Sequence, residues 1–342
     1  MTEKRIAVVG AGANGGAFGA DMINAGLDVT LFDQWPAHVE AMRADGLKVE
    51  MPGETVVTQV DAFHLCDIAT LPNTFDIVFL GVKAYDTLWA SELIKPLVAA
   101  DGLVVGLQNG MTIDDVASVV GAGRTIGAVI EVAAYMDEPG VIGRQTGPSG
   151  TWFGVGAYDA AAAGREAEIV DVLRHAGTAE VKSDIRSAKW MKLVVNAAEF
   201  LPSSILGLPL AEAIKLPGMH ELMMASGREA VHTALLLGQQ LVPIFGDTKV
   251  EANDPDGYAT TLLDAVLSDW TMPDTRVTVL QDWQKGRRAE VEEINGLVVR
   301  EQAARGGSAP VNKGLVEIAR RIESGELAAE PTNLGLLRNL LG

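Results

Sequence analysis

The first half of the chain alternates short apolar runs with longer amphipathic segments. Residues rich in Val, Ile, Leu and Phe recur at 6–9, 29–32, 77–82, 103–107 and 125–130. Buried strands that alternate with helices are typical of βαβ units, in which helices cover a mainly parallel sheet. Residues 1–183 are therefore expected to form a doubly wound α/β domain. Its end is expected to be a mixed sheet, because residues 140–154 are rich in glycine and favour loops or antiparallel strands.

The second half has a different periodicity, with apolar positions spaced as on helices and prolines between them. Residues 184–342 are therefore expected to form an all-helical domain. Its most apolar stretch, 193–214, contains Asn196 and Pro202, which indicates a buried helix and turn and not a membrane span. The segment Phe245–Tyr258 is polar and rich in Gly, Asp and Pro, so a surface loop is expected there.

The charge balance disfavours several classes of partner. The chain has 342 residues, of which 45 are acidic and 27 basic, and its formal charge is −18. This charge repels nucleic acid and anionic membranes, so neither is an expected partner. Cys66 is the single cysteine, which leaves no disulfide and no cysteine cluster for a metal. Because the N-terminus does not read as a secretory leader, the expected location is the reducing cytoplasm, and no metal is expected.

A glycine-rich loop directly follows the first predicted strand. The loop reads GAGANGG, which matches the GxGxxG pattern in the strand-to-helix context that dinucleotide binding requires. Gly10 permits a tight turn, Gly12 lets the backbone approach a pyrophosphate, and Gly15 lets the helix pack close to the strand. Ala13 and Asn14 are expected to present helical amides to the phosphates. The pattern favours a Rossmann-type dinucleotide site over a plain glycine turn in a domain without nucleotide.

Asp33 ends the second predicted strand, about 20 residues after the glycines, where a carboxylate accepts hydrogen bonds from the adenosine ribose. The same carboxylate repels the 2′-phosphate of NADP. Neither Gln34 nor Trp35 supplies the positive charge that NADP usually needs. NAD is therefore favoured over NADP, and a plain turn carboxylate is the alternative interpretation of Asp33.

Other catalytic arrangements are lacking in the sequence. No tyrosine is followed four residues later by a lysine, which disfavours a short-chain-reductase mechanism. The histidines have no paired metal spacing and no GxSxG serine accompanies them, which disfavours zinc and serine-hydrolase chemistry. The histidines are expected to be packing or surface residues.

Four stretches resemble one known family, in the same order and over nearly the full chain. They are the glycine loop, Gly81-Val82-Lys83-Ala84-Tyr85, Gln108-Asn109-Gly110-Met111, and a C-terminal pair formed by residues 189–196 and 281–296. Together they are similar to the ketopantoate reductase (2-dehydropantoate 2-reductase) family. The resemblance implies hydride transfer between NAD(P)H and the carbonyl of a small 2-oxo acid or ketone, which yields a 2-hydroxy acid.

Carried over by position, the resemblance implies that Lys192 is the general acid that protonates the carbonyl oxygen. Helical spacing supports this placement. Lys192 and Asn196 lie four residues apart on one helix face, where an ammonium and an amide can hold the same substrate. Lys189 lies one turn away, so a solvated lysine at the start of a helical domain is the alternative interpretation.

The resemblance also implies roles for residues outside this helix. Glu290 matches a glutamate that binds the substrate hydroxyl, and Thr278 stands where the family usually has a serine that helps to hold the carboxylate. Asn109 is expected near the reacting carbon, in contact with cofactor or substrate, and Lys83 on the cofactor side of the cleft. Glu290 and Asn109 join Lys192 as catalytic candidates. The neighbouring glutamates leave open a solvated acidic helix face at Glu290, and local loop contacts can explain Lys83 and Asn109.

The sequence departs from the family at Phe200, where members commonly have a second asparagine that helps to recognise the hydroxyls of pantoate. A phenyl ring cannot make that hydrogen bond, so specificity is expected to be relaxed or redirected. Phe200 is therefore a substrate-binding candidate. The expected substrate is a different 2-oxo acid or ketone, bulkier or more apolar, with aromatic contacts from Phe200 or Trp190.

Three alternatives remain open. The chain can be a genuine ketopantoate reductase, a β-hydroxyacid or opine-type dehydrogenase, or a sensor that binds NAD without turnover. The segment 286–296 argues against the second. The sequence has no signal for the oligomeric state, which leaves a homodimer open.

Overall fold

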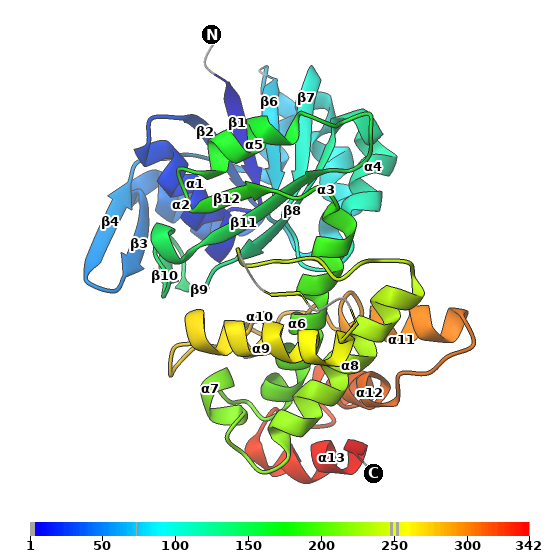
Figure 1. Cartoon of the computed structure of the whole chain (residues 1–342). Coiled ribbons are helices and arrows are strands. Elements are labelled where there is room, and N and C mark those ends of the chain that lie inside the picture. Colours follow the sequence, from blue (N-terminus) through cyan, green and yellow to red (C-terminus); the bar gives the residue numbers. More distant parts are fainter. Residues whose placement is uncertain (1–3, 73, 247–248, 251–252, 342) are drawn as a thin grey trace. The chain divides into compact units, whose positions relative to one another are not determined.

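The computed structural model describes residues 4–72, 74–246, 249–250 and 253–341. The chain divides into two compact units, Met1–Arg186 and Ser187–Gly342. The change of periodicity in the sequence puts the boundary after residue 183, close to this division. Within the described ranges, the first unit combines strands with helices and the second consists of helices and their connections (Figure 1).

The first unit is built on an eight-stranded sheet in the order β12-β11-β8-β7-β6-β1-β2-β5. Its strands are β1 (Arg5–Val9), β2 (Asp28–Asp33), β5 (Asp61–His64), β6 (Phe75–Leu80), β7 (Val98–Gly106), β8 (Thr125–Glu131), β11 (Trp152–Ala157) and β12 (Thr178–Val181). Neighbours from β5 to β8 are parallel, whereas β11 is antiparallel to β8 and parallel to β12. The sheet is thus doubly wound with a mixed end, as the sequence predicts.

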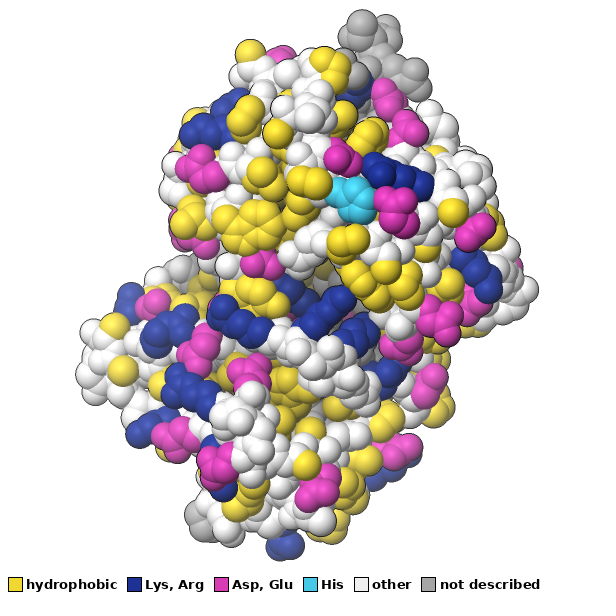
Figure 2. Space-filling view, turned by 180° about the vertical axis from the view of Figure 1, so that it is seen from behind, with side chains coloured by type: hydrophobic (Ala, Val, Ile, Leu, Met, Phe, Trp, Pro, Cys, Tyr) yellow, Lys and Arg dark blue, Asp and Glu magenta, His cyan; other side chains and the backbone are white. Residues whose placement is uncertain are grey.

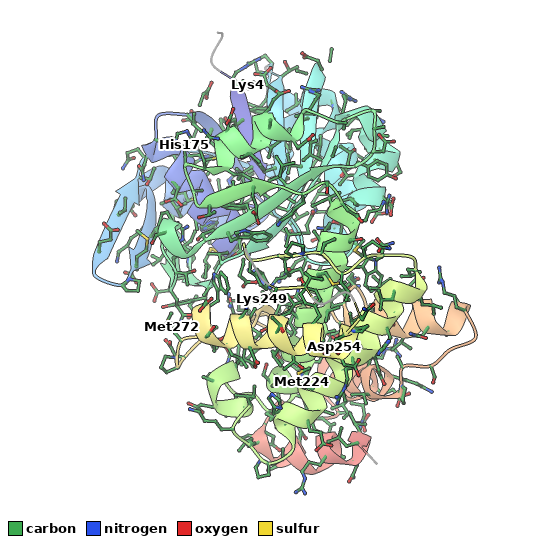
Figure 3. The ribbon with its side chains drawn as sticks, in the orientation of Figure 1. Lys4, His175, Met224, Lys249, Asp254 and Met272 are labelled. Carbon is green, nitrogen blue, oxygen red and sulfur yellow. The ribbon has the colours of Figure 1, made fainter. Side chains whose placement is uncertain are left out.

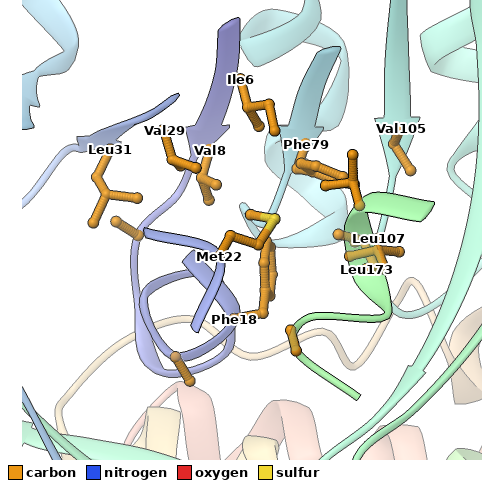
Figure 4. Packing of buried hydrophobic residues seen from close by; sticks show 14 of the residues in the cluster. Ile6, Val8, Phe18, Met22, Val29, Leu31, Phe79, Val105, Leu107 and Leu173 are labelled. Carbon is orange, nitrogen blue, oxygen red and sulfur yellow. The ribbon is translucent and has the colours of Figure 1, made fainter. Parts of the chain in front are cut away.

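Helices cover both faces of this sheet (Figure 1). They are α1 (Ala13–Asn24), α2 (Pro36–Asp45), α3 (Thr87–Ile94), α4 (Ile113–Val120) and α5 (Glu166–Leu173). Ile6 of β1 belongs to a core cluster with Phe18 of α1 and Leu173 of α5 (Figure 4). The next residue, Ala7, belongs to a second cluster with Val116 of α4. Because both faces are buried, the strands are nearly continuous apolar runs, which makes them recognisable in the sequence.

A small second sheet packs on α1. Its order is β4-β3-β10-β9, formed by β3 (Leu47–Met51), β4 (Glu54–Thr58), β9 (Ala134–Glu138) and β10 (Val141–Arg144). The packing is close, since a Cβ added at Gly16 of α1 would lie 2.6 Å from Ile142 Cδ1. Arg144, which is buried, forms an ion pair with Asp21 of α1. The antiparallel pair β9 and β10 agrees with the expectation for residues 140–154. The sequence analysis did not predict β3 and β4, which are short and half exposed.

The second unit is helical. Its helices are α6 (Ile185–Ile205, which starts just before the division), α7 (Leu210–Ala213), α8 (Met219–Leu236), α9 (Pro255–Asp269), α10 (Thr278–Gln284), α11 (Asn295–Ala304), α12 (Pro310–Glu323) and α13 (Leu334–Arg338). Asp254 and Met272 lie near the two ends of α9 (Figure 3). The Asp254 carboxylate accepts a hydrogen bond from the amide of Gly257, 2.9 Å away, and so caps this helix. In the described part of the chain, no helix combines the length and apolar character needed to cross a membrane.

The expected surface loop Phe245–Tyr258 is wrong at its two ends, and residues 247–248 and 251–252 of it lie outside the described residues. Helix α9 begins at Pro255, and Tyr258 within it is only 2% exposed. Phe245 is half-buried and packs against Trp270, with the ring centroids 5.1 Å apart. The polar composition favours a loop, but Asp254 and Pro255 are helix-start residues. Tyr258 is buried, and Phe245 packs against a second aromatic ring.

Candidate functional site

The glycine loop between β1 and α1 has a defined geometry. The amide of Gly10 donates to the carbonyl of Phe32 over 2.8 Å, and Gly10 has a left-handed φ of 95°. A Cβ added at Gly10 would lie 2.6 Å from the amide nitrogen of Val82, and one added at Gly15 would lie 2.0 Å from the carbonyl oxygen of Gly10. By contrast, a Cβ at Gly12 would meet nothing within 4 Å. Gly10 and Gly15 are therefore required by the fold, whereas Gly12 faces open space.

The start of α1 is suited to an anion. Gly12 is its N-cap residue, and no side chain in the described ranges makes a capping hydrogen bond to this helix. The first turn, which includes Ala13 and Asn14, contains no acidic side chain. Amides at a helix N-terminus carry a partial positive charge and attract phosphate. The geometry thus agrees with the phosphate-binding role that the sequence predicts for these residues.

His38 of α2 supports the glycine loop through the backbone of Ala11, a contact that no sequence pattern predicts. The side chain is fully buried, and its Nε2 lies 2.9 Å from the carbonyl oxygen of Ala11. The amide of Gly140 donates to its Nδ1 over 2.8 Å, so the proton is on Nε2, which donates to Ala11. The ring also stacks on Trp35. His38 is therefore a packing residue, as expected for the histidines, but one that positions the glycine loop.

Asp33 lies at the carboxyl end of β2 and is 7% exposed. Its Oδ1 accepts a hydrogen bond from the amide of Trp35 over 2.8 Å, which orients the carboxylate. On the neighbouring strand, His64 stands opposite Asp33 in the parallel register. His64 Nε2 lies 2.7 Å from Glu40, and Arg43 on the same helix as Glu40 contacts Glu40 as well. The arginine beside this strand end, Arg43, is therefore already paired with the carboxylates of Glu40 and Asp67.

Lys83 and Asn109 follow the carboxyl ends of β6 and β7, two adjacent parallel strands next to β1. Both residues are half-buried. The side chain of Gln108 bonds to Thr87 Oγ1 over 3.0 Å and to Thr112 Oγ1 over 3.3 Å, and so ties the two loops together. In doubly wound sheets, ligands bind at the carboxyl edge of the strands. The structure thus brings Lys83, Asn109 and the glycine loop to one edge of the sheet.

In the second unit, α6 carries three predicted residues on one face. Lys192, Asn196 and Phe200 are spaced four residues apart along this helix, and all three are buried, with 7%, 0% and 5% exposure. The Nζ of Lys192 lies 5.4 Å from the centroid of the Phe245 ring. A solvated lysine at the start of a helical domain is therefore not what the structure shows.

Lys189, one turn before Lys192, is buried as well, which the sequence analysis missed. Its side chain is withdrawn from water, and this desolvation lowers the pKa of Lys189 from 10.5 to about 7, against the opposing effect of the Glu290 charge. A lysine in a helical pattern is ordinarily exposed, so the sequence contains no signal for this burial.

Glu290 does not lie on a solvated helix face, which was the alternative to its predicted role. The segment between α10 and α11 is a series of turns, and Glu290 is 3% exposed. Its neighbours Glu292 and Glu293 pair with Arg320 and Arg288 instead. The charge of Glu290 acts on buried Lys189.

Thr278 is the first residue of α10. Its hydroxyl oxygen is buried and has no hydrogen-bond partner among the residues that the structure describes. A buried hydroxyl without a partner costs free energy, so a ligand oxygen would satisfy it. This observation agrees with the carboxylate-binding role that the resemblance implies.

A buried polar network holds α6 beside these residues. Pro202 has no amide hydrogen, so the helical bond to the carbonyl four residues earlier cannot form. Next to that point, the carbonyl of Ala197 accepts hydrogen bonds from Ser226 Oγ over 2.8 Å and from Asn295 Nδ2 over 3.0 Å. Asn295 Nδ2 also donates to Asn312 Oδ1 over 2.8 Å. Side chains from α8 and α11 thus fix the backbone of α6, and Asn312 of α12 holds Asn295 in place.

Basic side chains offset the negative net charge locally. Figure 2 shows that Lys and Arg side chains gather on one face of the helical unit. The turn after α10 carries Lys285, Arg287 and Arg288; the two arginines are exposed, and Arg288 pairs with Glu293. Local cations of this kind can attract a carboxylate to a protein whose formal charge is −18.

Two family models match the chain. Residues 6–158 match "Ketopantoate reductase PanE/ApbA", and residues 184–323 match "Ketopantoate reductase PanE/ApbA C terminal". A 2-dehydropantoate 2-reductase from Archaeoglobus fulgidus is 29% identical over 330 residues, which cover 95% of this chain and all of that protein.

Solved structures of similar proteins agree. A PanE/ApbA family ketopantoate reductase from Ralstonia eutropha has a TM-score of 0.78 and 27% identity, covering 94% of this chain and 99% of that one. D-mandelate dehydrogenase in a ternary structure with NADH and anilino(oxo)acetate has a TM-score of 0.83 at 22% identity, covering 94% and 98% of the two chains. The Rossmann-type first unit and the helical second unit are the fold of this family. The chain therefore belongs to the ketopantoate reductase family of NAD(P)-dependent oxidoreductases, which act on CH–OH groups and the corresponding carbonyls.

Proposed function

We propose that this protein uses NADH to reduce a 2-oxo acid with an apolar or aromatic side chain to the 2-hydroxy acid. The observation that carries the proposal is the buried face of α6. There a lysine and an amide are followed by Phe200, which has no polar group to offer a hydroxylated substrate. Phe245 adds a second aromatic ring beside Lys192.

In this mechanism, Lys192 binds the carbonyl oxygen and donates its proton to it, while Asn196 orients the substrate from the same helix face. When bound, the reduced nicotinamide supplies the hydride for the carbonyl carbon. Thr278 and the local cations hold the carboxylate, and Glu290 accepts a hydrogen bond from the hydroxyl of the product. Lys192 then recovers a proton from solvent. A positioned general acid contributes roughly 10² to 10⁴-fold to a rate.

The first unit would hold the dinucleotide. The amides of Gly12, Ala13 and Asn14 would contact the pyrophosphate, with Lys83 and Asn109 on the nicotinamide side. For the adenosine ribose, Asp33 supports NAD over NADP, because its carboxylate would repel a 2′-phosphate. Arg43 supports the same preference, since its guanidinium already pairs with the carboxylates of Glu40 and Asp67.

D-mandelate dehydrogenase has the same fold, and its structure contains NADH and anilino(oxo)acetate. That pair of ligands supports the proposal of NADH and an aromatic 2-oxo acid for this protein. Genuine ketopantoate reduction is the competing proposal. It is favoured by relatives named 2-dehydropantoate 2-reductase that match nearly the full chain.

The test is a set of initial rates with NADH and NADPH against ketopantoate, phenyl-2-oxoacetate and 3-methyl-2-oxobutanoate. We expect NADH-linked turnover of an apolar acid, with kcat about 10² to 10⁴-fold lower in Lys192→Ala. NADPH-linked turnover of ketopantoate above all other acids would establish the competing proposal. Binding of NADH with no turnover of any acid would indicate a sensor.

The single cysteine and the need for a nicotinamide pool support a cytoplasmic location. A homodimer is part of the proposal, because one structural neighbour is described as a dimeric ketopantoate reductase from Staphylococcus aureus. Light scattering of the purified protein gives the mass directly.

A further inference from the structure

Phe245 has a left-handed backbone conformation, which is unusual for a bulky residue. Its φ is 58°, and it is the one non-glycine residue with a positive φ in the described part of the chain. A bulky L-residue adopts the left-handed region at a cost in free energy, which persists only where the surroundings impose it. Residues in such strained conformations cluster at ligand sites, which makes the Phe245 ring a candidate for ligand contact.

The residues around Phe245 impose this conformation. Ile244 before it is fully buried, and the hydroxyl of Tyr258 in α9 donates to the carbonyl of Val242 over 2.5 Å. The Phe245 ring packs against Trp270, tilted by 43° at a centroid distance of 5.1 Å. Residues 242–245 are therefore held by the burial of Ile244, by the hydrogen bond to Val242 and by the packing of Phe245 on Trp270. These contacts fix the position of the Phe245 ring.

That place is beside the proposed proton donor. The Nζ of Lys192 lies 5.4 Å from the centroid of the Phe245 ring, within the range of a cation–π interaction. Phe245 is only half-buried. An ammonium thus lies over a ring that still has surface to offer a ligand.

A ring beside Lys192 bears on which substrate side chains fit next to this lysine. When the carbonyl oxygen of a substrate contacts the Nζ of Lys192, the side chain on the carbonyl carbon comes within reach of the Phe245 ring. Planar apolar groups pack favourably against an aromatic face. A hydroxyl group there would lose its water and find no hydrogen-bond partner on the ring.

We propose that Phe245 is a specificity-determining residue that binds the side chain of the 2-oxo acid and favours aromatic substituents over aliphatic and hydroxylated ones. The proposal rests on the proposed function, because it takes Lys192 as the group that holds the carbonyl oxygen. It assigns substrate selection to Phe245, in addition to Phe200 on α6.

The test measures binding of an unreactive pair of ligands to the NADH-loaded protein by calorimetry. Anilino(oxo)acetate carries a phenyl group on an oxamate core, and oxamate is the same core without it. The wild type is expected to bind the aromatic ligand more tightly. Phe245→Leu should reduce this preference about tenfold, the upper range for an aromatic contact, while Phe245→Tyr should keep it. Phe245→Asn tolerates a positive φ and removes the ring, so it should behave as the leucine variant does.

Kinetics with phenyl-2-oxoacetate and 3-methyl-2-oxobutanoate on the same variants complete the experiment. The ratio of kcat/KM for the two acids should fall in Phe245→Leu and Phe245→Asn and persist in Phe245→Tyr. A preference that is absent from the wild type, or unchanged in folded Leu and Asn variants, overturns the role of Phe245. If no acid is turned over but the binding preference depends on the ring, the proposed function fails and the role of Phe245 stands.

Discussion

Replacing Lys189 by methionine should make the stability of the protein less dependent on pH. Burial lowers the pKa of this lysine from 10.5 to about 7 in the folded protein. Between these values the unfolded chain carries the proton and the folded protein has released it. The unfolding free energy of the wild type therefore rises with pH through this window.

The magnitude follows from the same two values. At about 1.4 kcal/mol per pH unit, the difference between 10.5 and about 7 corresponds to about 5 kcal/mol. This cost of holding a buried ammonium applies in full below pH 7 and declines as the pH rises. Lys189→Met removes it, so the variant should gain most, relative to the wild type, at pH 6.5. The attraction to the Glu290 carboxylate is already included in the pKa of about 7, so the expected gain is the full difference of about 5 kcal/mol.

The assay is denaturant unfolding of the full chain at half-unit steps from pH 6.5 to 9. The difference between variant and wild type should shrink by about 1.4 kcal/mol per pH unit above pH 7. The double variant Lys189→Met with Glu290→Gln separates the loss of the cation from the effect on the carboxylate. Lys215→Met, at an exposed lysine of the same unit, is the matched control. A difference between Lys189→Met and wild type that is constant over this range would refute the reasoning.

Three further predictions concern the dinucleotide loop, the ribose contact and the helical network. Gly15→Ala should destabilise the protein by about 1–3 kcal/mol, since its Cβ would lie 2.0 Å from the Gly10 carbonyl. Gly12→Ala meets no neighbour within 4 Å and loses only the N-cap preference for glycine, so it should destabilise the apo protein by less than about 1 kcal/mol and weaken NADH binding. Asp33→Asn keeps an oxygen for the Trp35 amide but loses the charge, so the ratio of KM for NADPH to KM for NADH should fall about tenfold. Asn295→Ala should cost about 1–3 kcal/mol of unfolding free energy, because Asn312 and the Ala197 carbonyl lose a buried donor.

Each of these predictions has an outcome that contradicts it. Equal effects of Gly12→Ala and Gly15→Ala on apo stability would show that the open space at Gly12 has no functional meaning. An unchanged cofactor ratio in Asp33→Asn would remove the charge argument for NAD. Asn295→Asp keeps an acceptor and loses the donor, so stability equal to the wild type in that variant would show that the donor is not needed.

Local sequence patterns predicted the parts of the protein that local physics controls. The glycine loop was recognisable because its glycines are spaced for one turn and one helix start, and the structure places Gly10 and Gly15 where any side chain would clash. The strands of the large sheet were recognisable because burial on both faces makes them continuous apolar runs. The helical half was recognisable from its period, and Lys192 and Asn196 are indeed four residues apart on one helix.

Other features depend on residues that are distant in the sequence and meet only in the tertiary structure. His38, which contacts the glycine loop, accepts a hydrogen bond from the amide of Gly140, 102 residues later in the turn between β9 and β10. Phe245 was expected in a surface loop, but its ring lies against Lys192.

The burial of Lys189 and Glu290 likewise separates what local sequence determines from what tertiary packing determines. The sequence by itself determined the two-part architecture, the dinucleotide loop and the candidate face of α6, because these depend on period and spacing along the chain. Only the tertiary structure decided that both lysines, one turn apart, are buried, and that Glu290 is buried while its neighbours Glu292 and Glu293 pair with arginines. The physical reason is that desolvation is set by the packing of all surrounding elements, and no local sequence window contains that information.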